Sequence, residues 1–235
     1  MISVCIATYN GEKYIREQLL SILFQLESHD EIIISDDHST DETISIIKSL
    51  NDNRIKIFFN VKKGYTNNFQ NAILQASGDH IFLSDQDDVW EKNKVKVMSE
   101  FLKEHDFVVS NAKIVDENLV PTGLTFFEMR GGGTKGFWSN LIKAKYLGCC
   151  MAFNKNILPK LIPFPQKVKL CPHDLWLSLI SEFYYKTYVI SEHLVLYRRH
   201  GHNVSTGAAK STSSFLFKVK FRVYSFFKVI CRATA

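Results

Sequence analysis

The first 110 residues alternate short apolar runs with stretches in which apolar side chains recur at helical spacing. The apolar runs are continuous, which is typical of strands that are buried on both faces of a parallel sheet. We expect strands at residues 3–7, 31–35, 55–59, 80–84 and 107–110, and helices at residues 12–26, 39–50, 66–77 and 91–104. This order predicts an α/β fold with a mostly parallel central sheet that is flanked by helices.

The second half of the chain is less regular. Residues 121–145 are rich in glycine and predict a mobile loop, whereas residues 169–183 predict a short helix and residues 188–190 a strand. In the first half, Ser39 stands three residues before Glu42, which predicts a capping box at the start of the second helix.

The composition indicates one globular unit with a basic tail. Hydrophobic residues make up 46% of the 235 residues and charged residues 23%, which is ordinary for a protein that buries a core. The formal net charge is +5, and residues 211–235 account for all of it with five cations and no acid. Residues 1–210 are therefore neutral overall, and their composition does not indicate nucleic-acid binding.

The five cysteines are odd in number and scattered, and no pair has the CxxC spacing. This pattern indicates reduced, structural thiols in a cytoplasmic protein rather than a disulfide framework. Met1 leads directly into the first expected strand, so we expect no signal peptide. No stretch approaches the roughly 18 uncharged apolar residues that a transmembrane helix needs.

Residues 215–232 form a basic amphipathic segment. In a helix, apolar side chains share one face and cations lie mostly opposite: Leu216, Val219, Val223, Phe226 and Ile230 against Lys218, Arg222, Lys228 and Arg232. Such a helix can lie on an anionic membrane surface or pack on the rest of the chain. The alternation in residues 217–223 also permits a strand, so three alternatives stay open.

Ligands of open α/β sheets bind beyond the carboxyl ends of the strands, so the residues directly after each strand are candidates for a site. Asp85, Asp87 and Asp88 follow the fourth expected strand. Three carboxylates in four residues repel one another unless a cation or hydrogen bonds compensate them. Their oxygens suit Mg²⁺ or Mn²⁺, with diphosphate oxygens completing the coordination. The alternative is a solvated acidic turn that caps a helix.

Asp36 and Asp37 follow the second expected strand. A carboxylate here can accept a hydrogen bond from the N3–H of uracil or thymine, which a purine does not present in the same way. The pair therefore favours a pyrimidine nucleotide. The alternative is N-capping of the next helix, although Ser39 already suits that task.

Three motifs occur in order: Ala7-Thr8-Tyr9-Asn10-Gly11, SDDHSTDET from Ser35, and FLSDQDDVW from Phe82. With them the chain resembles family 2 glycosyltransferases of the GT-A fold over roughly residues 1–205. Within the family it is most similar to rhamnosyltransferase-like members of bacterial surface-polysaccharide synthesis. The resemblance implies a transferase domain at residues 1–210, with a donor-binding half (1–110) and an acceptor-binding half (111–210), followed by the tail at 211–235.

The resemblance also implies roles for single residues. Ala7, Thr8, Tyr9 and Asp37 contact the base; Asp87 contacts the ribose and metal, and Asp88 the metal and diphosphate; Asp85 is an accessory member of the cluster. His173-Asp174 resembles the family's acidic dyad, in which Asp174 is the general base. Taken alone, the same pair is also a plausible helix N-terminus.

Two further segments fit the family. Residues 197–203, from Tyr197 to Asn203, resemble its closing segment: His200 is the candidate metal ligand or phosphate donor, and Arg198 and Arg199 pair with phosphates. A basic solvated loop is the alternative. Trp90, Cys149 and His173 are candidate acceptor contacts, although at Cys149 we would expect a hydroxyl or small residue.

These features together predict an inverting transferase that uses Mn²⁺ or Mg²⁺. It takes a sugar from a dTDP- or UDP-sugar, with dTDP-rhamnose favoured, to a hydroxyl of a lipid-linked glycan at the cytoplasmic membrane. Two alternatives stay open: a non-catalytic subunit of glycan assembly, and a nucleotidyltransferase on a related sheet. The second usually carries a glycine-rich basic loop after its first strand, where this chain has Thr8-Tyr9-Asn10-Gly11-Glu12.

Overall fold

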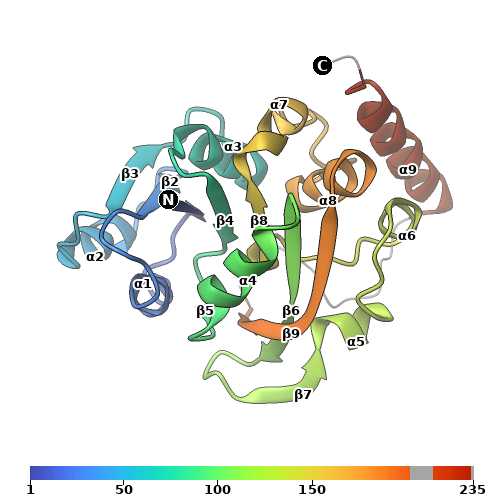
Figure 1. The fold of residues 1–235 in the computed structure, drawn as a ribbon. Coiled ribbons are helices and arrows are strands. Elements are labelled where there is room, and N and C mark those ends of the chain that lie inside the picture. The colour runs from blue at the N-terminus through green and yellow to red at the C-terminus, as the bar shows by residue number, and fades with distance from the viewer. Residues whose placement is uncertain (202–213, 234–235) are drawn as a thin grey trace.

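The computed structural model of the protein describes residues 1–201 and 214–233. Asn203 of the predicted closing segment and the predicted domain boundary at residue 210 lie outside the described residues. The first half alternates strands and helices as expected (Figure 1): β1 (Ile2–Thr8), α1 (Ile15–Leu23), β2 (Glu31–Asp36), α2 (Thr43–Ser49), β3 (Ile55–Phe59), α3 (Tyr65–Gln75), β4 (His80–Ser84), β5 (Val89–Trp90) and α4 (Lys94–Leu102).

The second half adds strands that extend the same sheet and helices at its end. Its elements are β6 (Phe107–Val115), β7 (Pro121–Thr125), α5 (Phe126–Arg130), α6 (Phe137–Ile142), the 3₁₀ turn η1 (Gly148–Cys150), β8 (Met151–Asn154), η2 (Lys155–Ile157), α7 (Leu158–Leu161), α8 (His173–Tyr184), β9 (Thr187–Arg198) and α9 (Phe215–Ile230).

One sheet runs through the described part of the chain in the order β3-β2-β1-β4-β8-β6-β9-β5, with β7 paired to β6. The long ladders are parallel: β1 with β2 and β4, β2 with β3, and β6 with β9. The short strand β8 joins the two halves and runs antiparallel to both β4 and β6. The predicted α/β fold with a mostly parallel sheet flanked by helices is confirmed.

The predicted capping box at Ser39 is wrong, because α2 begins at Thr43 and has no side-chain cap. The Ser39 hydroxyl instead donates to the Asp36 carboxylate at 2.7 Å and accepts from the main chain of Asn10 at 2.9 Å. Ser39 therefore joins two strand ends rather than starting a helix.

The predicted mobile loop at residues 121–145 is also wrong, because this segment holds β7, α5 and α6. Thr125 and Glu128 form a capping box at the start of α5, and Gly131 ends the helix in the left-handed conformation with φ 87°. Phe126 and Phe127 anchor α5 in the core.

The tail segment is a helix, so the strand alternative is wrong. Ser225 and Val229 are fully buried, and two hydrogen bonds fix α9 to the domain: Ser225 Oγ to Leu170 O at 3.0 Å and Tyr184 Oη to Val229 O at 2.8 Å. Figure 1 shows α9 at the rim of the molecule, beyond α8 and α6. Its outer side keeps exposed apolar residues: Phe215, Leu216, Val219, Val223, Phe227 and Ile230. None of the described helices has the length and apolarity to cross a membrane.

Candidate active site

The carboxyl ends of β1, β2 and β4 meet at one edge of the sheet. At this edge Asp36 is fully buried and accepts hydrogen bonds from Thr8 Oγ1, Ser39 N and Ser39 Oγ, each at 2.7 Å. Its carboxylate is therefore occupied by the protein itself. Asp36 ties the end of β1 to the end of β2.

Asp37 lies next to this junction, where its main-chain N donates to Thr8 O at 2.9 Å. Its carboxylate is half-buried and accepts from Asn60 Nδ2 and Gly64 N, both at 2.8 Å. A carboxylate has about four lone-pair sites, so Asp37 can accept a further N–H from a ligand. The structure thus brings Asp37 and the segment from Ala7 to Tyr9 together.

Gln86 holds the main chain of Tyr9 on both sides. Its Oε1 accepts from Tyr9 N at 2.8 Å, and its Nε2 donates to Tyr9 O at 3.0 Å. A Cβ atom at Gly11 would lie 2.5 Å from Gln86 Oε1, so glycine allows this close approach. We did not predict a role for Gln86, whose only signal is its position inside the acidic motif.

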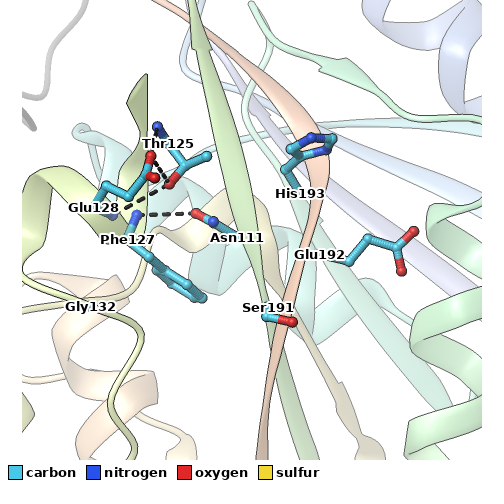
Figure 2. Close-up of a pocket in the computed structure, with 8 residues that line it drawn as sticks. All are labelled: Asn111, Thr125, Phe127, Glu128, Gly132, Ser191, Glu192 and His193. Atoms are coloured by element: carbon cyan, nitrogen blue, oxygen red, sulfur yellow. Dashed lines mark hydrogen bonds between the residues drawn. The ribbon is translucent and has the colours of Figure 1, made fainter. Parts of the chain in front are cut away.

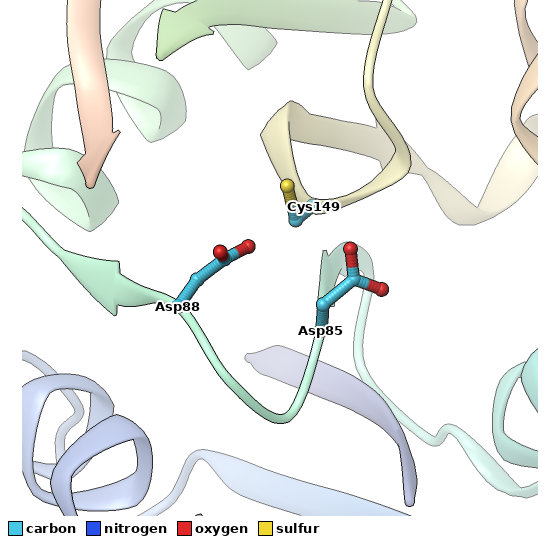
Figure 3. Close-up of side chains that lie close together, drawn as sticks. All are labelled: Asp85, Asp88 and Cys149. Atoms are coloured by element: carbon cyan, nitrogen blue, oxygen red, sulfur yellow. The ribbon is translucent and has the colours of Figure 1, made fainter. Parts of the chain in front are cut away.

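Residues 85–88, between β4 and β5, form a turn that we call the acidic turn, and its carboxylates point in two directions. Asp87 Oδ2 lies 2.8 Å from His200 Nε2, whereas Asp88 Oδ1 accepts from the main-chain N of Arg198 at 2.9 Å. Asp85 and Asp88 face Cys149 across the turn (Figure 3), and one ligand atom from each lies within 4.8 Å of the others. The predicted metal ligands Asp87 and His200 are thus together, while Asp88 is turned toward Asp85 and Cys149.

Burial disfavours the charged forms of the Asp85 and Asp88 carboxyl groups. Burial first, and the neighbouring charge of Asp87 second, raise the pKa of Asp85 to about 7 and the pKa of Asp88 well above its usual range. The Asp88 Oδ2 atom is buried and has no hydrogen-bond partner among the described residues, although the Cys149 thiol lies beside it. A buried, unpaired carboxylate oxygen is costly unless something compensates it.

These residues fit a divalent cation. Asp85 and Asp88 offer hard oxygen ligands, and the Oδ2 atom of Asp88 is buried and unpaired. Cys149 adds a sulfur atom, which Mg²⁺ disfavours and Mn²⁺ tolerates better. Cys149, which we predicted as an acceptor contact, therefore lies against the candidate metal ligands.

Arg198, which ends β9, and Arg199, which follows it, donate to protein acceptors. Arg198 is almost fully buried and donates to the main-chain oxygens of Asp87 at 2.8 Å and Glu117 at 2.7 Å, and to the carboxylate of Glu17. Arg199 donates to Tyr197 Oη at 3.2 Å. Arg198 thus fixes the acidic turn to α1 and to the turn after β6, and its predicted phosphate contact would need these bonds to rearrange.

Asp174 lies in the first turn of α8, where its Oδ1 accepts from the main-chain N of Leu175 at 2.7 Å. Its negative charge contributes to the raised pKa values of Asp85 and Tyr65, after burial in both cases. A Cβ atom at Gly148 would lie 3.8 Å from Asp174 Cβ, and the next residue, Cys149, faces Asp85 and Asp88. Asp174 therefore lies next to the turn that carries Cys149, and its role as the base stays a prediction.

His173, the neighbour of Asp174, is buried and stacks on Phe69 with ring centroids 4.4 Å apart. Neither of its ring nitrogens has a hydrogen-bond partner among the described residues, and burial lowers its pKa. A Cβ atom at Gly148 would lie 2.9 Å from His173 Nε2. Glycine at 148 therefore lets α8 approach the turn that carries Cys149.

Lys94 holds the turn that carries Cys149, a role that we did not predict from the sequence. Its ammonium is fully buried, donates to Cys149 O at 2.6 Å and lies 4.0 Å from the centroid of the Trp90 ring. Trp90, a predicted acceptor contact, belongs to β5 and is buried in the core next to Lys94. The sequence carries no signal for this contact, because Trp90 lies in β5 and Lys94 is the first residue of α4.

A hollow of about 640 Å³ lies between β6, β9 and α5 (Figure 2). The predicted site residues do not line it. Some of its polar groups bond to one another: Asn111 Oδ1 accepts from Phe127 N at 3.0 Å, and Thr125 and Glu128 form the capping box of α5. We assign it no ligand.

Comparison with known proteins agrees with this geometry. The family model described as "Glycosyl transferase family 2" matches residues 3–162. A dTDP-rhamnosyl transferase, RfbG of Shigella flexneri, is 32% identical over 92% of this chain and 76% of its own length. WfgD of Escherichia coli, named a UDP-Glc:alpha-D-GlcNAc-diphosphoundecaprenol beta-1,3-glucosyltransferase, is 26% identical over 77% of this chain and 70% of its own length.

A solved structure shares the fold. The Staphylococcus aureus TarS fragment 1–349 with UDP-GlcNAc superimposes with a TM-score of 0.71 at 21% identity, covering 96% of this chain and 66% of that one. The fold and the acidic strand-end site define a glycosyltransferase of the GT-A class. The chain belongs to glycosyl transferase family 2. This membership removes the nucleotidyltransferase alternative.

Proposed function

We propose that the chain is an inverting transferase that moves a sugar from a dTDP- or UDP-sugar, with dTDP-rhamnose favoured, to a hydroxyl of a lipid-linked glycan. The glycan belongs to an O-antigen, a capsule or a related bacterial polysaccharide, and transfer takes place at the cytoplasmic face of the membrane. The names of the two relatives support this reading. The observation that carries it is the position of Asp174 beside Gly148, where an added Cβ atom would lie 3.8 Å from Asp174 Cβ, next to the Cys149 that faces Asp85 and Asp88.

The proposed roles follow the halves of the chain. In residues 1–110, Asp37 accepts the base N–H beside the segment from Ala7 to Tyr9, and Asp87 contacts the ribose. Residues 111–210 bind the acceptor, with His173 offering a neutral imidazole to a sugar hydroxyl. The attacking hydroxyl gives its proton to Asp174 as it displaces the nucleoside diphosphate in line, so the anomeric configuration inverts.

The candidate ligands of Mn²⁺ or Mg²⁺ are Asp88, Asp85 and Cys149, with Asp87 and His200 on the other side of the turn. A divalent cation bound there would offset the negative charge of the departing diphosphate. The protein's own part is to hold these ligands: Arg198 N fixes Asp88, and Arg198 Nε fixes the main chain of Asp87.

The test is Asp174→Asn in the full chain, with a nucleotide-sugar donor and a lipid-linked acceptor. Loss of the general base is expected to reduce kcat by about 10²–10⁴. Asp79→Asn, at an exposed carboxylate near the N-terminus, is the matched control and should keep full turnover. Full transfer by Asp174→Asn would remove the base assignment, and absence of any transfer by the wild type would favour a non-catalytic subunit. NMR of the product tests inversion.

We also propose that residues 215–232 make peripheral contact with an anionic membrane. Only one side of α9 is needed to pack on the domain, and its outer side remains apolar and basic. On α6, Trp138 and Ile142 are exposed too, and the Trp138 ring stacks on Phe226 with centroids 5.7 Å apart. The two helices together offer an apolar surface with flanking cations, which suits the interfacial zone of a bilayer.

A further inference from the structure

Lys94 places a positive charge inside the protein. It is the first residue of α4 and is fully buried, although a lysine usually extends its ammonium into solvent. Its Nζ atom donates to Cys149 O at 2.6 Å and lies 4.0 Å from the centroid of the Trp90 ring. Removing an ammonium from water is costly, so these two contacts have to compensate the burial.

The turn η1, which accepts the bond from Lys94, is too short to fix its own position. Its three residues are buried, and two hydrogen bonds close its main chain: Cys150 N to Leu147 O at 3.1 Å and Met151 N to Gly148 O. A single 3₁₀ turn has poorer hydrogen-bond geometry than an α-helix. The position of η1 therefore depends on the groups packed around it, of which the Lys94 ammonium is one.

One side of η1 faces the acidic turn (Figure 3). Cys149 Sγ and one carboxylate oxygen each from Asp85 and Asp88 lie within 4.8 Å of one another. The main-chain oxygen of the same cysteine accepts from Lys94. Lys94 therefore helps to set how closely Cys149 approaches the two acids.

Another residue of η1 contacts the start of α8. A Cβ atom at Gly148 would lie 2.9 Å from His173 Nε2 and 3.8 Å from Asp174 Cβ. The turn thus lies between the candidate metal ligands and the candidate base. A shift of η1 would change the spacing between them.

We propose that Lys94 is a positioning residue for sugar transfer, which holds η1 at the spacing that the acidic turn and Asp174 require. The proposal rests on the proposed function, in which Asp174 is the base. Without the bond to Cys149 O, η1 can move, and the start of α8 can move with it. The nucleotide should still bind, because Asp37 and Tyr9 are held by hydrogen bonds that do not involve η1.

The experiment compares Lys94→Met with the wild-type full chain. Methionine adapts to the buried space but removes the ammonium and its hydrogen bond. We expect kcat for transfer to fall roughly tenfold to a hundredfold, as a misplacement of about 1 Å can cause, while the Kd of UDP and dTDP with Mn²⁺ changes little. Lys96→Met, at an exposed lysine two residues further along α4, is the matched control and should keep the wild-type kcat. An unchanged kcat in Lys94→Met, or equal losses of kcat and nucleotide affinity, overturns the proposal.

Gly148→Ala disturbs the same turn from the side of His173, where the new Cβ atom has no room. If both residues act through η1, the loss of kcat in the double variant should be smaller than the product of the two single losses. Losses that multiply would show that Lys94 acts independently of η1 and would overturn the proposal. Thermal melting shows that each variant is folded, and Lys94→Leu replaces Lys94→Met if the methionine variant is not.

Hydrogen exchange of the main-chain amides tests the position of η1 without any turnover. Exchange at Cys150 and Met151, whose amides close η1, should be faster in Lys94→Met than in the wild type and in Lys96→Met. Equal exchange rates in the three proteins contradict the proposal. An Asp174→Asn variant with full activity would end the proposed function while leaving the exchange result intact.

Discussion

Gln86 and Asp36 serve the site by holding other residues in place. The Asp36 carboxylate accepts hydrogen bonds from Thr8 and Ser39, and the Gln86 amide forms two hydrogen bonds with the main chain of Tyr9. Neither side chain needs to contact a ligand, but both fix the positions of Tyr9 and Asp37.

Gln86→Ala is expected to weaken nucleotide binding severalfold, because Tyr9 loses both main-chain hydrogen bonds. At about 0.5–1.5 kcal/mol for each of the two bonds, the free energy of unfolding should fall by roughly 1–3 kcal/mol, and by less if water replaces them. UDP and dTDP titration and urea denaturation measure the two effects. Gln75→Ala, at an exposed glutamine that ends α3, is the control. Equal nucleotide affinity in both variants would show that the Tyr9 contact is unimportant.

Asp85 makes the metal-free protein sensitive to pH. Its folded pKa of about 7 lies above its usual value of 3.8, so between these values the native state keeps a proton that the unfolded state loses. The contribution of Asp85 to stability is therefore present at low pH and is lost as the pH rises toward 7 and beyond. In EDTA, Asp85→Asn should gain stability relative to the wild type between pH 5 and pH 7.5, measured by urea denaturation. An equal difference at both pH values would contradict this.

At the scale of elements, the strands and helices of the first half were predictable because continuous apolar runs and helical periodicity recur in turn. The elements that the pattern missed are short. β8 has four residues, and α5 has five whose only local signals are Thr125 and Glu128. Their place depends on neighbours distant in sequence, such as β4 and β6 on either side of β8. Likewise Ser39 matched a capping pattern, but Asp36 bound its hydroxyl instead.

The site was predictable to the extent that its residues follow strands. Asp37 follows β2, and Asp87 and Asp88 follow β4, at the edge of the sheet where the carboxyl ends of these strands meet, whereas Asp174 lies in the first turn of α8. Lys94 was missed because a lysine at the start of a helix looks like an ordinary surface cation. Only the folded structure reveals that Lys94 is fully buried and donates to Cys149 O.

The outer side of α9 leads to a prediction for the element as a whole. Val223→Ser with Phe227→Ser is expected to reduce cosedimentation with phosphatidylglycerol vesicles severalfold, because it removes exposed apolar area without touching the packed side of the helix. Phe24→Ser, at an exposed aromatic residue that follows α1, is the matched control. Binding should also weaken in high salt and with phosphatidylcholine vesicles. Loss of self-association instead of vesicle binding would identify α9 as an interface between copies.

At the scale of the whole molecule, a cognate nucleotide should stabilise the fold. A ligand at 100 times its Kd adds ~2.7 kcal/mol to the free energy of unfolding. We expect UDP or dTDP with Mn²⁺ to raise the melting temperature, and excess EDTA to reduce the gain. Thermal shift across a panel of nucleotides measures this. Greatest stabilisation by GDP would contradict the role of Asp37, and indifference to EDTA would contradict the metal site.

The hydrogen bond from Arg198 to Asp88 joins residues 110 positions apart. During synthesis the acidic turn leaves the ribosome long before β9 exists, so the nascent chain carries the acids without the strand that orients them. We expect a chain truncated before Arg198 to show no stabilisation by UDP and Mn²⁺. An unfinished molecule would then be unable to capture an activated sugar and waste it on water.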